Sequence, residues 1–242
     1  MSVKDIHIKP IDSGRANEFI KQYHYSGKVV PNSQLHLGVF YHGSLEGVMQ
    51  FGPPIYRENL IQLVEGTGWN EMMELNRMAF TDKLPQNSGS RCLSIAFKLF
   101  EKHAPHVKWV VSFADATQCG DGAVYRASNF ILTGITERGD MVKLSNGETV
   151  HRISIENHSD KPRPELGGKS LYDITGGTYD WQAYIDESGG EVLPGYQLRY
   201  IYFIDDDYRD NLTVPEIPYE RIDELGAGMY KGEKISVAER KP

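Results

Sequence analysis

Cysteine is scarce in this sequence. Only two of the 242 residues are cysteine, Cys92 and Cys119. They do not form a CxxC pair, so the sequence indicates neither a zinc site nor a disulfide framework. So few thiols are typical of a protein that works in a reducing compartment.

Long apolar runs are missing as well. The first residues, MSVKDIHIKPIDS, lack the apolar core of a signal peptide. No apolar run reaches the length that a helix needs to cross a bilayer. We therefore expect a cytoplasmic protein with no membrane partner.

The sequence also lacks an excess of positive charge. Its 26 Lys and Arg stand against 33 Asp and Glu, which gives a formal net charge of −7. Neutralising phosphates requires Lys and Arg, so this balance argues against nonspecific binding of nucleic acid. A local basic patch would escape that argument, because charge can be segregated. The stretch DDDYRD at 205–210, for example, carries much of the acidity in one place.

What the sequence does contain is ordinary for a globular protein, with 40% hydrophobic and 24% charged residues. Stretches with helical spacing alternate with stretches of period two. These patterns predict helices over 13–27, 91–103 and 120–130, hairpins over 34–54 and 141–155, and strands over 72–80, 107–116, 131–138 and 196–205.

This order mixes antiparallel hairpins with one strand–helix–strand crossover, which should be right-handed with its two strands parallel. We predict an α/β (α+β) protein with a mixed β-sheet flanked by helices, in one domain over residues 1–242. Residues 156–180 are rich in Gly, Pro, Asp and Ser and predict a loop excursion, and loops of that length are often functional. Residues 205–242 predict a polar C-terminal tail along the surface.

The turn PQNSGSR at 85–91 joins a predicted strand to the helix over 91–103. Free backbone N–H groups and the positive end of the helix dipole make such a turn an anion site, and its small residues let a pyrophosphate approach. Arg91 would add charge. The alternative is that Ser88 or Ser90 only caps the helix, and the turn alone favours the cap.

Arg77 stands in the strand over 72–80, where alternation places it on the face of Leu75 and Ala79. A charge among apolar neighbours must be paired or used. Asp115 is the natural partner, because it ends an apolar strand at the edge where ligands bind in parallel sheets. The alternatives are a purely structural Arg–Asp pair, or a capping role for Asp115 at the next helix.

Two further residues are candidates for the same place. Tyr125 falls in the first turn of the helix over 120–130, either as a core aromatic or with its hydroxyl toward the site. His24 ends the first helix, where a histidine can be structural, a base near neutral pH or a metal ligand. The other histidines show no HxH or HxxxH spacing, so no ready-made metal site is indicated.

The strand–loop–helix–strand–helix order resembles the Gcn5-related N-acetyltransferase fold, in which the turn before the central helix grips the coenzyme A pyrophosphate. The turn PQNSGS departs from the glycine-rich turn usual there, and TQCGDG replaces an expected histidine-containing turn. A closer resemblance, over residues 18–136, is to the phage Mom family of DNA-modification proteins. Its motifs run in order here as YHYSG, LHLGVF, GVMQFG, ELNRMAF, PQNSGSR, VVSFADAT and AVYRASNF, with LRYIYFI later.

The Mom resemblance implies an enzyme that places a carbamoylmethyl group on N6 of adenine in phage DNA and so protects it from host restriction. It implies functional roles for His24, Arg77, Ser90, Asp115 and Tyr125. Asp115 would grip or activate the adenine amine, and Tyr125 would protonate a departing thiolate. Arg77 would hold Asp115 or a phosphate, and His24 would be a base or an iron ligand.

The resemblance to acetyltransferases implies acetyl-CoA or another acyl-CoA as cofactor, with the true donor left open. The residues expected to bind it are Asn87, Ser88, Gly89, Ser90 and Arg91. The alternative functions are an N-acetyltransferase that uses acetyl-CoA on a small amine or a protein, and a noncatalytic fold that only binds DNA or a partner.

The expected macromolecular partner is double-stranded DNA with the target adenine flipped out of the stack. Lys161, Arg163 and Lys169 in the 156–180 excursion are the expected DNA contacts. A homodimer is left open. As a phage protein, the chain would act in the cytoplasm of the host cell.

Overall fold

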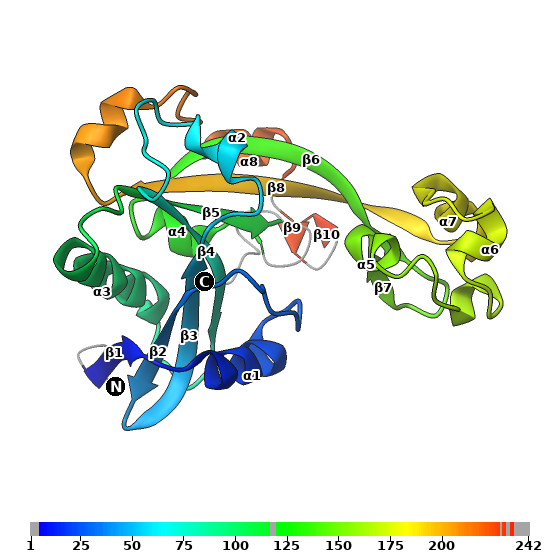
Figure 1. Cartoon of the computed structure of the whole chain (residues 1–242), viewed down its shortest axis with the longest axis horizontal. Coiled ribbons are helices and arrows are strands. Elements are labelled where there is room, and N and C mark those ends of the chain that lie inside the picture. Colours follow the sequence, from blue (N-terminus) through cyan, green and yellow to red (C-terminus); the bar gives the residue numbers. More distant parts are fainter. Residues whose placement is uncertain (1–4, 117–119, 228, 231–232, 235–242) are drawn as a thin grey trace.

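The computed structural model describes residues 5–116, 120–227, 229–230 and 233–234. It shows a body built on a mixed sheet and an arm, residues 144–190, which extends from it at the right of Figure 1. The eight-stranded sheet has the order β1-β2-β3-β4-β5-β8-β6-β7. Its strands are β1 (Ile6–Pro10), β2 (Leu35–Tyr41), β3 (Ser44–Gly52), β4 (Met72–Phe80), β5 (Trp109–Asp115), β6 (Ile131–Lys143), β7 (Thr149–His151) and β8 (Glu191–Phe203).

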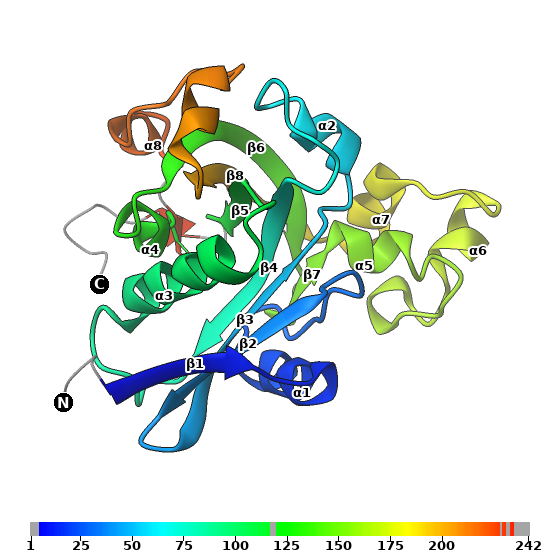
Figure 2. The same cartoon turned by 60° about the vertical axis from the view of Figure 1, so that its left-hand side comes forward.

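Helices cover both faces of the sheet, so the predicted mixed α/β class is confirmed. The main helix α3 packs on one face and α1 on the other, as Figure 2 shows. The helices of the body are α1 (Ser13–Tyr23), α2 (Arg57–Ile61), α3 (Ser88–His103), α4 (Ala123–Arg126) and α8 (Glu220–Glu224). Within the described residues, no helix combines the length and the apolar character of a membrane span.

The central crossover is confirmed too. β4 and β5 are the parallel pair of the sheet, and α3 connects them. The parallel pairing covers only three residues on each strand and ends at Glu74 and Val111. Beyond these residues β4 continues along β3, whereas β5 continues along β8. We call this divergence the β4–β5 opening.

The bulge at Asn76 changes the faces of β4. The pairing with β3 shifts by one residue there, so Asn76 is an extra residue in the strand. Met78 therefore joins Leu75 in the core on the α3 side, while Ala79 packs with α1. The expectation that Arg77 shares a face with Leu75 is wrong, because the bulge turns Arg77 to the α1 side with Ala79.

The arm contains more regular structure than the expected loop excursion. Its helices are α5 (Arg152–Glu156), the 3-10 helix η2 (Pro164–Leu166), α6 (Leu171–Thr175) and α7 (Trp181–Ser188). They enclose a small core of their own, whose buried residues are Ile155, Leu166, Leu171 and Tyr184. The long strands β6 and β8 run side by side from the body into the arm (Figure 1).

The segment after β8 lies along the body, and its Ile222 and Ala227 are buried in the core on the α3 side. It forms the 3-10 helix η3 (Asp206–Asn211), which packs with α2, and then α8. A separate two-stranded ribbon pairs β9 (Met229–Tyr230) with β10 (Glu233–Lys234). The rest of the predicted tail, at 228, 231–232 and 235–242, and the TQC of the departing turn at 117–119 lie outside the described residues.

The sequence also predicts helix caps at Ser13 and Asp121, and these caps and the hairpin over 141–155 are wrong, each for a hydrogen-bonding reason. Asp12, not Ser13, caps α1, because the Asp12 carboxylate accepts a hydrogen bond from the backbone amide of Arg15. Asp121 does not cap α4, since its carboxylate pairs with Arg126 at 2.7 Å. The hairpin over 141–155 stops at His151, because the His151 ring accepts from a backbone amide and caps α5.

Candidate functional site

The β4–β5 opening brings polar side chains from both faces of the sheet to one place. Glu74 and Arg77 reach it on β4 from the α1 side, and Ser112 on β5 reaches it from the α3 side. His24 reaches it from the end of α1, and Tyr125 from α4. Most of the residues expected to share a site therefore do so.

Arg77 is half-buried and held in a fixed direction. Its Nε donates to the carbonyl oxygen of Lys28 at 3.0 Å and its Nη1 to that of Asn76 at 2.7 Å. Burial lowers the pKa of Arg77, while two tyrosines and Glu74 raise it. Glu74 is thus a carboxylate whose charge acts on Arg77, and the pairing of Arg77 with Asp115 stays a prediction.

Glu74 is the residue that the sequence analysis missed. It lies at the last paired position of β4, opposite Val111 on β5. Burial raises the pKa of Glu74, and a hydrogen bond from Asn76 and the charge of Arg77 only partly offset this rise. A half-buried carboxylate with a raised pKa beside an arginine is a candidate general base.

His24 lies within reach of the charge on Arg77. Burial and then that charge lower the pKa of His24 from 6.5 to about 4, so its ring is neutral near pH 7. Nδ1 of His24 accepts from the Ser26 amide at 3.2 Å and lies 2.8 Å from Ser26 Oγ. With Nδ1 as acceptor, Nε2 carries the proton, so His24 offers the site a hydrogen-bond donor rather than a base.

The iron suggested by the resemblance does not fit the residues around His24. A protein metal site needs several convergent ligands. In the described part of the chain no group of three or more His, Cys, Asp or Glu side chains is arranged to hold a metal ion. Nδ1 of His24 is already engaged by Ser26. We therefore derive no step through iron.

Tyr125 combines the two roles that its sequence position left open. Its ring is buried and packs against Phe130 and Tyr200, with centroid distances of 5.2 Å to each. Its hydroxyl accepts a hydrogen bond of 2.9 Å from Ser112 Oγ. The phenol also contributes to the pKa of Arg77, which places it on the opening. A core ring thus carries a hydroxyl toward the site.

The N-terminus of α3 is open. Asn87 stands at the cap position with a left-handed backbone (φ 65°), and its side chain makes no capping hydrogen bond. The hydroxyls of Ser88 and Ser90 donate to the carbonyl oxygens of Pro85 and Asn87, so neither serine caps the helix. Among the described residues, the Gly89 and Ser90 amides have no hydrogen-bond acceptor, which leaves them for an anion.

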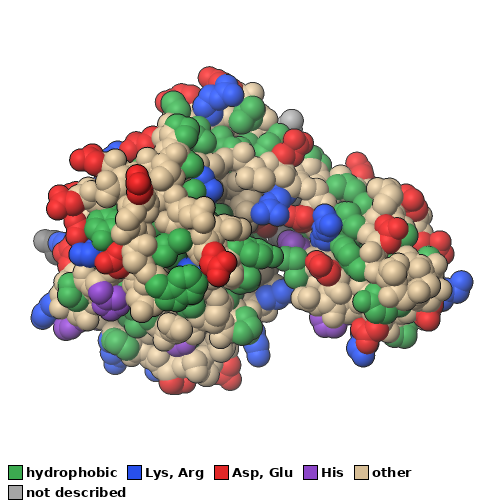
Figure 3. Space-filling model, turned by 45° about the horizontal axis from the view of Figure 1, so that its top comes forward, with side chains coloured by type: hydrophobic (Ala, Val, Ile, Leu, Met, Phe, Trp, Pro, Cys, Tyr) green, Lys and Arg blue, Asp and Glu red, His purple; other side chains and the backbone are tan. Residues whose placement is uncertain are grey.

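Asp115 ends β5, and its charge acts on His151 in the arm. Burial lowers the pKa of His151 in the arm, and the charges of Asp140 and Asp115 raise it in part. Lys28 and Arg138 act on the same histidine. Figure 3 shows charged side chains of both signs and a histidine around the hollow between body and arm. α4 begins too far along the chain for Asp115 to cap it.

The expected DNA contacts in the arm differ in availability. Lys161 and Lys169 are exposed, and Lys161 forms an exposed ion pair with Asp160 at 3.0 Å. Arg163 is engaged within the arm, where it pairs with Glu165 at 3.3 Å and donates to a backbone carbonyl at 3.0 Å. Arg163 therefore holds the arm together, and the two lysines are the accessible cations of the three.

The fold and site together define a mixed α/β protein in which two parallel strands diverge beside an open helix N-terminus. The chain belongs to the Mom protein family, whose model matches residues 5–221. It is 40% identical over 153 residues to the methylcarbamoylase Mom of Escherichia phage Mu. That alignment spans 63% of this chain and 62% of the phage Mu protein.

Solved structures with a similar arrangement include acetyltransferases. An IAA acetyltransferase from Bacillus cereus is 11% identical with a TM-score of 0.43, covering 80% of this chain and 97% of its own. A spermidine/spermine N-acetyltransferase from Vibrio cholerae is 9% identical with a TM-score of 0.43, covering 86% of this chain and 97% of its own.

Proposed function

We propose that this protein modifies N6 of adenine in double-stranded DNA by carbamoylmethylation and thereby protects phage DNA in the host cell from restriction. The observation that carries the proposal is the family match over residues 5–221, which includes every residue of the β4–β5 opening. The name of the phage Mu relative, a methylcarbamoylase, agrees with this chemistry.

The residues of the opening supply what the acceptor amine needs. The lone pair of adenine N6 is drawn into the ring, so a carboxylate that accepts its proton makes it a better nucleophile. Asp115 is our first candidate for holding the amine, and Glu74, with its raised pKa, is the second candidate for accepting the proton. Arg77, whose direction is fixed by two carbonyl groups, adds a positive charge that acts on Glu74.

The leaving group would depart beside Tyr125. Its hydroxyl lies 2.9 Å from Ser112 Oγ, and a phenol can donate a proton as well as accept a hydrogen bond. Protonation by a buried phenol stabilises a thiolate as it leaves. His24, with Nε2 protonated, adds a second donor on the α1 side.

An acyl-CoA-type donor fits the open end of α3. The free amides of Gly89 and Ser90 and the positive end of a 16-residue helix suit a pyrophosphate, and Arg91 is exposed beside them. Gly89 lies so close to α4 that an added Cβ would approach Val124 Cγ2 to 2.8 Å. Such a donor, when bound, would supply an activated carbon. Transfer from a thioester carbonyl would leave an amide on N6, so the carbamoylmethyl product requires a donor in which N6 displaces a leaving group from an alkyl carbon.

DNA would lie over the hollow between body and arm. Glu74 and Arg77 are partly buried, so an adenine inside a duplex cannot reach them without leaving the base stack. Lys28 and Arg138 border the hollow, and Lys161 and Lys169 extend the cationic surface along the arm. These residues supply phosphate contacts on a chain of net charge −7.

Mass spectrometry of nucleosides from cells that express the protein tests this function. We expect deoxyadenosine to gain an adduct of carbamoylmethyl mass. Asp115→Ala should abolish the adduct, whereas Asp210→Ala, an exposed aspartate outside the site, should leave it unchanged. Unmodified DNA from cells that contain folded wild-type protein would contradict the proposal. An adduct of acetyl mass would keep the enzyme and change its donor.

A further inference from the structure

A second exposed feature lies beside the opening, on the loop between β3 and α2. Ile55 and Tyr56 at its tip are 77% and 73% exposed, more than any other large hydrophobic residue in the described chain. Trp69, on the segment that returns to β4, is 55% exposed. The loop and Trp69 border a cavity of about 420 Å³, a volume typical of sites for small organic groups.

The tip is presented on a stiff support. Pro53 and Pro54 precede it, and each proline ring fixes its own φ. The carbonyl oxygen of Pro53 accepts a hydrogen bond from the Asn32 side chain, which ties the base of the loop to the body. Behind the tip, α2 anchors its Leu60 against the core on the α1 side of the sheet. The two most exposed apolar side chains thus stand on a rigid projection.

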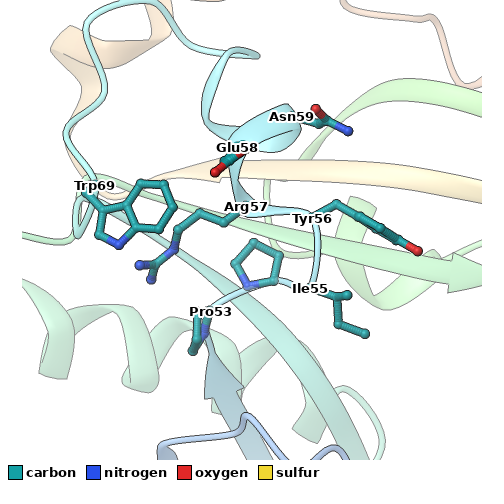
Figure 4. Close-up of a pocket in the computed structure, with 8 residues that line it drawn as sticks. Pro53, Ile55, Tyr56, Arg57, Glu58, Asn59 and Trp69 are labelled. Carbon is teal, nitrogen blue, oxygen red and sulfur yellow. The ribbon is translucent and has the colours of Figure 1, made fainter.

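Arg57 gives the same loop a polar element. Its guanidinium lies over the Trp69 ring, 4.9 Å from the centroid. Its Nε is buried, and no described residue accepts a hydrogen bond from it. Figure 4 shows Arg57 reaching toward Trp69, whereas Ile55 and Tyr56 point to the opposite side. An arginine plane on an indole is a surface on which a nucleobase stacks.

The loop starts directly at the site. Gly52, the residue before Pro53, pairs across the sheet with Glu74. Gly52 also lies against Asn76, whose carbonyl oxygen holds Arg77. Glu74, which would act on the adenine, therefore lies on the strand next to the one that leads into the tip. The tip would act on the bases that neighbour this adenine in the stack.

We propose that the loop over 53–59 is a wedge that opens the DNA base stack, with Ile55 and Tyr56 entering the step that the target adenine leaves. This inference rests on the proposed function. Apolar side chains inserted between bases unstack a step and favour the extruded base. A base of the opened step would then lie beside Arg57 and Trp69, in the cavity that the loop borders.

The fluorescence of 2-aminopurine tests the wedge without any knowledge of the donor. Duplexes would carry 2-aminopurine at an adenine position that the protein modifies on a plasmid, since this base brightens when it leaves the stack. Wild-type protein at saturation should raise the signal. The double variant Ile55→Ala/Tyr56→Ala should bind the duplex but lose most of the signal, and plasmid modification should fall about tenfold or more. Ile153→Ala/Tyr172→Ala on the arm is the matched control, because it removes the same two residue types from exposed positions.

A duplex in which the target base is already unpaired distinguishes a wedge from a loop that only contacts the DNA. When 2-aminopurine stands opposite an abasic site, extrusion no longer requires insertion, so the double variant should reach the wild-type signal. Equal signals from variant and wild type on the intact duplex would overturn the wedge. If the wild type is dimeric and the double variant is monomeric, with an unchanged 2-aminopurine signal, the tip instead contacts a second copy of this chain and the wedge is overturned. Absent signal and absent modification with wild-type protein would refute the proposed function itself.

Discussion

The β4–β5 opening and the arm use charged side chains in different ways. In the opening, burial moves the pKa values of His24, Glu74 and Arg77 away from their ordinary values. In the arm, the half-buried Arg163 and Glu165 pair with each other, and Glu165 also accepts from a tyrosine hydroxyl at 2.9 Å. Groups whose pKa values are shifted mainly by burial mark a candidate site, whereas in the arm the hydrogen bonds and ion pair of Glu165 outweigh the effect of burial and hold the fold together.

The two regions also differ in how their cores are built. The body has a continuous core in which side chains from most of the sheet meet α3. The arm has its own cluster around Leu171 and Tyr184, separate from the body cores. Its helices are short, so they depend on this cluster rather than on intrinsic helix stability. The arm is therefore expected to open without unfolding the body.

The largest expected effect comes from Arg77. Arg77→Ala should lower adenine modification by about a hundredfold or more, because it removes an oriented charge from the reacting groups. Arg77→Lys should do nearly the same, since an ammonium cannot keep both directed hydrogen bonds to the carbonyl groups. The measurement is the amount of modified deoxyadenosine per adenine at equal protein level. An equal loss from Arg163→Ala, in folded protein, would contradict the division between the two regions.

A pair of leucine substitutions compares the two cores directly. Leu171 in the arm and Leu93 in α3 are both fully buried. Truncating either to alanine should cost about 2–5 kcal/mol of local stability, because apolar side-chain atoms are removed and a cavity remains. Amide hydrogen exchange should show Leu171→Ala weakening protection in the arm alone and Leu93→Ala weakening it throughout the body. Loss of protection across the whole chain in both variants would show that body and arm unfold as one unit.

The two regions should also lose stability in different pH ranges. The pKa of His24 is about 4 in the folded protein and 6.5 when solvated, so the unfolded chain takes up a proton first. Stability of the body should therefore fall as pH drops from 6.5 to 4. Burial alone would raise the pKa of Glu165, but hydrogen bonds from the backbone and Tyr184 and the charge of Arg163 lower it below 4.5. That stabilisation of the arm is complete above pH 4.5 and is lost below it.

Denaturation curves recorded across this pH range check both signs. His24→Asn should flatten the slope of body stability between pH 6.5 and 4, and Glu165→Gln should flatten that of the arm below pH 4.5. Fluorescence of Trp181 reports on the arm, in variants in which the tryptophans of the body are replaced by phenylalanine. A steeper slope in either variant would reverse the assignment.

The sequence predicted the helices and strands in which apolar residues recur at a regular spacing over many residues. Strand alternation gave the hairpin of β2 and β3, and the apolar stripe of the chain after Ser88 gave α3. The arm helices α5 and α6 escaped prediction because segments of five residues do not complete two turns, and the eight-residue α7 was missed as well. β1 was also missed, since its alternating Ile6 and Ile8 span too few residues to stand out.

The sequence suggested several groups at the opening but not all of their neighbours. The charge of Arg77 acts on His24, and Tyr125 acts on Arg77, while the roles of these residues stay predictions. Glu74 was missed as a neighbour of Arg77 because strict alternation places the two on opposite faces, and the bulge at Asn76 cancels that offset. A bulge leaves no clear mark in one sequence, so only the structure shows that Glu74 and Arg77 share a face.

The smallest expected effect concerns the exposed lysines of the arm. Lys161→Glu/Lys169→Glu should weaken DNA binding several-fold and reduce the dependence of log Kd on log salt by about one for each phosphate that the protein no longer neutralises. Lys98→Glu/Lys102→Glu on α3 is the control, because it makes the same change in net charge from exposed positions of the body. Salt titrations of both variants separate a local effect from that of the overall charge. If both pairs change the slope equally, the arm only adds to the charge of the whole protein and does not lie along the duplex.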